Sequence, residues 1–128
     1  MNFRAIILIV IMTLCILDLS MTYFYIYKYK KWQPNKPYKL IELNPILRIS
    51  LETFGLHLGM FIASIIILAL NYYVVKNTHW IFSVILFLIL IFTMINHTRN
   101  ITLLFRLIDK YPFGHLPVTI FGKVEENN

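Results

Sequence analysis

Residues 55–75 are the feature that most limits what this chain can fold into. The only side chain in this stretch that can carry a charge near neutral pH is that of His57, and the only side-chain amide is that of Asn71. A helix that crosses a bilayer needs about 20 such predominantly apolar residues. Just upstream, Asn44 can cap a helix start, and Pro45 suits the first helical position because proline lacks an N–H. The pattern predicts one long helix that starts at Asn44, enters a membrane and continues to Val75.

The composition supports a membrane environment for the whole chain. Of 128 residues, 59% are hydrophobic and only 14% are charged, whereas soluble domains are typically about 45–50% apolar and about 25% charged. A chain this short forms one domain at most. Because it cannot hide so much apolar surface inside itself, lipid must cover the rest. We therefore expect a single all-α integral membrane domain over residues 1–128, in the cell membrane.

Two further apolar runs complete a bundle of three transmembrane helices. The first run covers residues 5–27 and continues to the lysines without the small-residue cleavage site of a signal peptide, which predicts a retained span. The third run starts at Trp80, and its helical spacing extends past Asn100 towards Asp109. The predicted spans are residues 5–27, 55–75 and 80–97, with a basic loop at 28–54 and a short tail at 111–128.

Basic residues predict the orientation of the bundle. With three spans, the N-terminus shares one side with the turn at Lys76, and that side carries only Arg4 and Lys76. The opposite side carries Lys28, Lys30, Lys31, Lys36, Lys39, Arg48, Arg99, Arg106, Lys110 and Lys123. Lys and Arg favour the cytoplasmic side of a membrane. We expect the N-terminus to lie outside and the C-terminus in the cytoplasm.

The basic loop predicts a partner. Five lysines are concentrated directly after the first span, at positions Lys28, Lys30, Lys31, Lys36 and Lys39. Such juxtamembrane clusters attract anionic lipid headgroups. The cluster adjoins a span and carries no nucleic-acid recognition motif, so we expect lipid contact and no nucleic-acid binding.

Polar residues of the spans form the candidate site. A carboxylate such as Asp18 costs at least about 2.5–3.5 kcal/mol at the centre of a membrane helix, so it should face protein or water. With the orientation above, the polar residues of the first and third spans fall in the inner half of the membrane, near the loop that precedes the second span. We expect one polar cluster there, formed by Asp18, Thr22, Glu42, Asn44, Asn96 and His97.

Two interpretations of this cluster are open. Its members can simply hydrogen-bond between helices, or the carboxylates and imidazole can serve a divalent metal or a proton relay. The chain has no His-Glu-x-x-His pattern, phosphate-binding loop or Gly-x-Ser-x-Gly pattern, so we assign no catalytic residue and no required cofactor.

A stripe of small residues predicts close helix packing. Gly55, Gly59 and Ala63 follow one another at four-residue spacing, the small-xxx-small pattern that lets two helix backbones approach. We expect this stripe to pack inside the bundle, with homo-oligomerisation as the alternative.

The first half of the chain also resembles a known group of proteins. Asp18-x-x-x-Thr22 in the first span, followed by Glu42-x-Asn44-Pro45 before the second, is similar to a pattern in a family of small prokaryotic multi-span membrane proteins of unknown function. The resemblance implies no activity, but it implies that these five residues belong together, as a loop docked against the first helix.

Three functional hypotheses follow. The first is a structural, accessory or partner-binding bundle, which requires no further chemistry and is the one that we favour. The second is an intramembrane metal site or enzyme at the inner leaflet that uses Asp18, Glu42 and His97. The third is an oligomeric ion or proton path along the same polar residues, which the apolar outer half of the spans disfavours.

Overall fold

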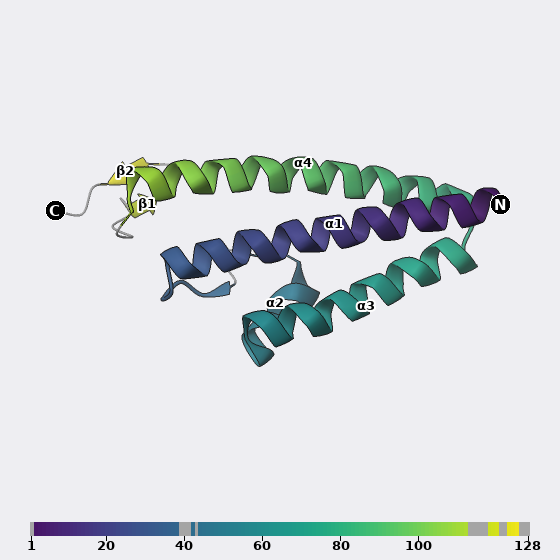
Figure 1. Ribbon diagram of the computed structural model, residues 1–128, viewed down its shortest axis with the longest axis horizontal. Coiled ribbons are helices and arrows are strands. Elements are labelled where there is room, and N and C mark those ends of the chain that lie inside the picture. The colour runs from purple at the N-terminus through teal and green to yellow at the C-terminus, as the bar shows by residue number, and fades with distance from the viewer. Residues whose placement is uncertain (1, 39–41, 43, 113–117, 121–122, 126–128) are drawn as a thin grey trace.

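The protein is a small helical bundle with a two-stranded hairpin near its C-terminus (Figure 1). The structure is a computed structural model that describes residues 2–38, 42, 44–112, 118–120 and 123–125. Its elements are α1 (Phe3–Trp32), α2 (Pro45–Phe54), α3 (Leu56–Asn77), α4 (Trp80–Lys110), β1 (Val118–Ile120) and β2 (Lys123–Glu125). Lys39, which the sequence places in the basic loop, lies outside the described residues.

Three of the helices, α1, α3 and α4, are long and apolar enough to cross a membrane. Helix α3 begins one residue after the start of the predicted span 55–75, whereas α1 and α4 include the predicted spans 5–27 and 80–97 and are longer than those spans. With 30 and 31 residues and a rise of 1.5 Å per residue, each is about 45 Å long, against about 30 Å for a hydrocarbon core. The basic ends of α1 and α4 can therefore extend beyond a bilayer while α3 just spans it.

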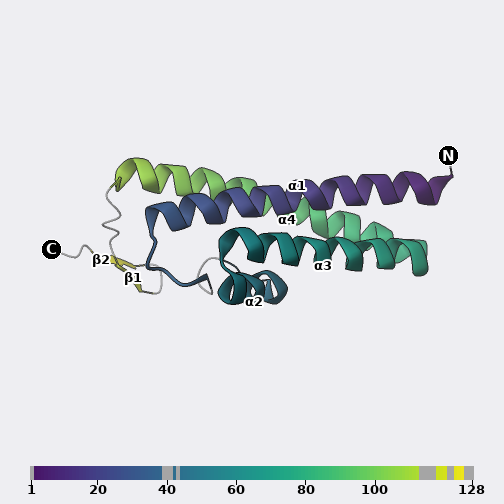
Figure 2. The same ribbon diagram turned by 60° about the horizontal axis from the view of Figure 1, so that its bottom comes forward.

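The three long helices lie side by side, and α1 packs against both others (Figures 1 and 2). The N-terminus and the start of α4 adjoin one hollow, lined by Asn2, Phe3, Arg4 and Trp80. At the opposite end, the indole Nε1 of Trp32 donates a hydrogen bond of 2.7 Å to the carbonyl of Tyr111. Consequently α1 and α4 run parallel, and α3 runs antiparallel to both.

The second predicted helix is interrupted, which corrects the expectation of one helix from Asn44 to Val75. Asn44 does cap a helix that starts at Pro45, because its side chain accepts a hydrogen bond of 3.0 Å from the amide of Ile46. That helix ends at Phe54 and is followed by Gly55, whose φ of 83° and ψ of −175° belong to a region that only glycine adopts readily. The chain reverses there, and α2 folds back against the first turns of α3.

Close packing between α2 and α3 depends on Gly59 rather than on Gly55. The hydroxyl of Ser50 donates a hydrogen bond of 2.6 Å to the carbonyl of Gly59, and a Cβ at Gly59 would lie 2.7 Å from the carbonyl oxygen of Ser50. Ala63 is fully buried one turn later. Gly55 is exposed, with open space where a Cβ would lie, so it makes the turn and does not pack as the sequence suggested.

The core is a narrow apolar seam. On α1 the buried residues Ile11, Cys15, Leu19 and Ile26 lie on one face, and residues of α2, α3 and α4 pack against them. Most large apolar side chains point outward, including Phe61, Phe92 and Ile95. Such a surface suits a hydrocarbon environment, in which outward apolar side chains cost nothing.

Candidate functional site between α1 and α4

The candidate site starts from two matching polar faces on parallel helices. On α1, Asp18, Thr22 and Tyr25 are spaced at i, i+4 and i+7, which places them on one face. On α4, the polar residues Thr93, Asn96, His97 and Asn100 repeat at the same helical spacing. Since α1 and α4 run in the same direction, the two faces meet along about two turns.

At the centre of the meeting point, Asp18 contacts His97. Nδ1 of His97 lies 2.8 Å from Oδ1 of Asp18, and the two side chains keep only 20% and 15% of their exposure, respectively. This Oδ1 is buried and makes no well-aligned hydrogen bond with the described residues. The contact is therefore close and electrostatic, and one carboxylate oxygen retains unused acceptor capacity.

Thr22 contacts both residues of the pair. Its side chain is 2% exposed, and its hydroxyl donates a hydrogen bond of 2.9 Å to the carbonyl of Asp18. The same hydroxyl oxygen lies 3.3 Å from Nδ1 of His97. Because two oxygen atoms face Nδ1, we assign a proton to that nitrogen, which leaves Nε2 as the imidazole's free position when the ring is neutral.

The segment before α2 brings a second carboxylate to the site. Oε1 of Glu42 accepts a hydrogen bond of 2.9 Å from the amide of Asn44, and the amide of Glu42 donates one of 2.9 Å to the carbonyl of Tyr38. These two bonds hold Glu42 and Asn44 directly ahead of the α2 N-terminus, where negative charge is favourable.

A polar pocket of about 340 Å³ lies between these elements. Its lining consists of Thr22, Tyr25, Glu42, Asn44, Thr93, Asn96, His97 and Asn100. Five residues of the predicted polar cluster line this pocket, and the sixth, Asp18, contacts His97 from behind it. The structure thus brings together all six residues, although their role in binding stays a prediction.

Three residues that line the pocket, Tyr25, Thr93 and Asn100, were not in the predicted cluster. Thr93 and Asn100 lie on the same polar stripe of α4 as Asn96 and His97. Tyr25 belongs to a run of alternating tyrosines that is typical of a membrane interface. Its position three residues after Thr22 is the signal that could have found it, because that spacing keeps both side chains on one helical face.

The pocket offers unused polar groups. Among the described residues, the side-chain amides of Asn96 and Asn100 make no hydrogen bond within the protein. The hydroxyl of Thr93, in contrast, donates a hydrogen bond of 2.7 Å to the carbonyl of Ile89. Within the part of the chain that the structure describes, no three His, Cys, Asp or Glu side chains are grouped closely enough to hold a metal ion.

Lys30 stabilises part of the basic loop beside the pocket. Nζ of Lys30 donates hydrogen bonds to the carbonyls of Pro34 and Lys36 and lies 4.4 Å from the ring centroid of Tyr38. Burial raises the pKa of the Tyr38 phenol, so the ring stays neutral beneath the ammonium group. Lys31 and Lys36, by contrast, have exposed side chains.

Comparisons with known proteins add no further constraint: no protein-family model, curated protein or solved structure matches this chain. The resemblance of its first half to a prokaryotic membrane family stays a prediction.

Proposed function

We propose that the protein is a multi-pass protein of the cell membrane that acts by binding, and that the polar pocket between α1 and α4 holds a small hydrogen-bonding cation such as a protonated amine. In this proposal the N-terminus is outside, so the pocket opens near the cytoplasmic surface. The distribution of Lys and Arg between the two ends of the bundle supports this orientation.

The observation that carries the proposal is the chemistry of the pocket wall. Glu42 lines the pocket together with His97, whose partner Asp18 supplies a second carboxylate. The unused amides of Asn96 and Asn100 add acceptor oxygens on the α4 side. An ammonium group has three donors and no acceptor, so it matches a wall rich in oxygen atoms with two nearby negative charges.

A second hollow next to the polar pocket favours a binding site over a conducting path. Further towards the N-terminus of α1, the same two helices enclose a second hollow of about 230 Å³. Its lining is apolar except for Ser83. An ion leaving the polar pocket in that direction would lose its polar partners, which is costly in a low-dielectric environment.

Thermal unfolding of the detergent-purified protein tests the proposal, with ethanolamine as the probe and glycerol as an uncharged control. A ligand that binds only the folded state raises stability by about 2.7 kcal/mol at 100 times its Kd. We expect ethanolamine to raise Tm in a concentration-dependent manner and glycerol to leave it unchanged. Glu42→Gln keeps the acceptor for the Asn44 amide but removes the charge, so it should abolish the ethanolamine effect.

The matched control is Glu52→Gln, because Glu52 is an exposed carboxylate on α2 and does not line the pocket. This variant should respond to ethanolamine as the unmodified protein does. An equal response to glycerol, or a full ethanolamine response in Glu42→Gln, would rule out the proposed cation site.

The Asp18–His97 contact favours a second candidate, a divalent metal site or a metal-dependent enzyme that uses Asp18, Glu42 and His97. This candidate requires Glu42 to move closer to the pair, because the three side chains are not grouped closely enough to hold a metal ion as they stand. Metal analysis of the same preparations separates the two candidates. The metal site requires a stoichiometric metal that is lost in both Asp18→Ala and His97→Ala and retained in Glu52→Gln. A cation site for amines requires no such metal.

A further inference from the structure

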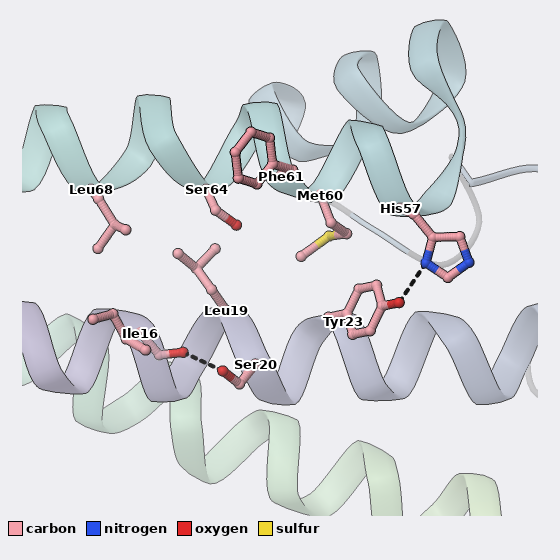
Figure 3. Close-up of a pocket in the computed structure, with 9 residues that line it drawn as sticks. All are labelled: Ile16, Leu19, Ser20, Tyr23, His57, Met60, Phe61, Ser64 and Leu68. Atoms are coloured by element: carbon pink, nitrogen blue, oxygen red, sulfur yellow. Dashed lines mark hydrogen bonds between the residues drawn. The ribbon is translucent and has the colours of Figure 1, made fainter.

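A groove between α1 and α3, on a different side of α1 from the polar pocket, has the features of a lipid site (Figure 3). It has a volume of about 380 Å³ and is shallow, with apolar walls that include Ile16, Leu19, Phe61 and Leu68. The hydroxyl of Ser20 is already bonded to the carbonyl of Ile16 at 2.8 Å. Apart from the hydroxyl of Ser64, which also lines the groove, the middle of the groove is apolar and suited to a hydrocarbon chain.

One end of the groove is polar. The hydroxyl of Tyr23 lies 2.5 Å from Nδ1 of His57, and this pair closes the end nearest to the start of α3 (Figure 3). The rings of Tyr23 and Tyr27 lie against the imidazole, with centroid distances of 5.8 and 6.4 Å. Lys31 is exposed and follows Tyr27 by one helical turn on the same face of α1. The polar end of the groove thus joins an apolar channel, and Lys31 lies about 12 Å beyond Tyr23 along α1.

The length of the groove matches one leaflet. From His57 to Leu68, at 1.5 Å per residue, the groove runs about 16 Å along α3, and half of a hydrocarbon core is about 15 Å. Its polar end faces the same end of the bundle as the basic loop. A lipid whose headgroup sits at Tyr23 and His57 would extend its acyl chain towards Leu68, at the membrane midplane.

The apolar walls and the polar end of the groove together suit a lipid, because a lipid carries an apolar chain and a polar headgroup in one molecule. The geometry points to one acyl chain of an anionic phospholipid from the leaflet at the basic end, with its phosphate near Tyr23, His57 and Lys31. This site is separate from the amine pocket and does not depend on it.

Native mass spectrometry of the full chain, purified in a mild detergent with either phosphatidylglycerol or phosphatidylcholine, tests the inference. We expect one phosphatidylglycerol to be retained per chain and phosphatidylcholine to be lost. Ser64→Phe places a ring in the groove and should lower retention at least tenfold. Ala69→Phe adds the same ring at an exposed position of α3 outside the groove and should leave retention unchanged.

A second pair of variants keeps the test decisive if Ser64→Phe does not fold. Lys31→Gln should lower phosphatidylglycerol retention about fivefold, because one lysine near an anionic headgroup contributes about 1 kcal/mol. Lys36→Gln, which removes an exposed lysine of the loop, should change it much less. Equal retention of both lipids, unchanged retention in both Ser64→Phe and Lys31→Gln, or a dimeric mass without lipid would overturn the inference.

Discussion

At the scale of single residues, the pair Asp18–His97 is the most consequential contact. A buried carboxylate oxygen faces the imidazole at 2.8 Å without a well-aligned hydrogen bond among the described residues. Removing one member of such a pair leaves the other without compensation, which costs more than the pair itself contributes. The effect on protein stability of replacing one of these side chains therefore depends on whether the other is present. This holds whether or not the pair acts on a ligand.

A double-mutant cycle on this pair measures the coupling. We expect His97→Ala to lower the free energy of unfolding by about 1–3 kcal/mol, because it leaves the Asp18 carboxylate unpaired. Adding Asp18→Asn to His97→Ala should recover part of that loss, since the variant then carries no unpaired charge. Reversible unfolding in mixed micelles provides the measurement.

The control for this cycle is Asp109→Asn, which alters an exposed carboxylate near the end of α4 and should change stability by no more than about 0.5 kcal/mol. Strictly additive effects of Asp18→Asn and His97→Ala would show that the two side chains do not interact in the membrane protein.

At the scale of elements, the hairpin of α2 and α3 determines where Glu42 and Asn44 lie. Gly55 turns the chain, and Gly59 allows the backbone of α2 to approach α3. The α2 N-terminus, together with the residues just ahead of it, is thereby directed to the pocket between α1 and α4. The two glycines act for different physical reasons. Gly55 allows the positive φ of the turn, whereas Gly59 has no Cβ to collide with the backbone of α2.

Gly59→Ala tests the contribution of close packing. The added Cβ would lie 2.7 Å from the backbone carbonyl of Ser50, so α2 must move away from α3. We expect faster amide hydrogen exchange in α2 while exchange in the centre of α1 is unchanged. Ala69→Ser, at an exposed position of α3, should leave exchange in α2 as it is. Unaltered α2 protection in Gly59→Ala would contradict the packing argument.

At the scale of the whole molecule, the parallel arrangement of α1 and α4 gathers the basic residues at one end. The predicted basic loop and the end of α4 lie together there, and Trp32 links them through its hydrogen bond to Tyr111. The opposite end holds the N-terminus and the turn between α3 and α4. Such a distribution of charge favours one orientation in a membrane.

Cysteine labelling in intact cells tests that orientation. The buried Cys15 is first replaced by Ala, and single cysteines are then introduced at Asn77 or Lys36. We expect a membrane-impermeant maleimide to label Asn77→Cys in intact cells and Lys36→Cys only after permeabilisation. The reverse pattern would place the basic end outside.

The features that depend on local chemistry could be predicted from the residues alone. The three membrane-length helices follow from the length of their apolar runs, and the start of α2 follows from Asn44 and Pro45, because cap and run act within a few residues. The polar stripes on α1 and α4 also follow from helical spacing. For this reason the four members of the polar cluster on these two helices, Asp18, Thr22, Asn96 and His97, could be named before the fold was known.

How these elements meet could not be predicted and depends on the packing of the whole bundle. The contact between Asp18 and His97 requires a particular register of two helices that are far apart in the chain, and helical spacing within one element cannot specify that register. The break at Gly55 likewise depends on α2 finding a surface on α3, because a single glycine within a helical pattern is compatible with an unbroken helix. The pairing of Tyr23 with His57 has the same origin, since helix packing, rather than local propensity, selects which faces touch.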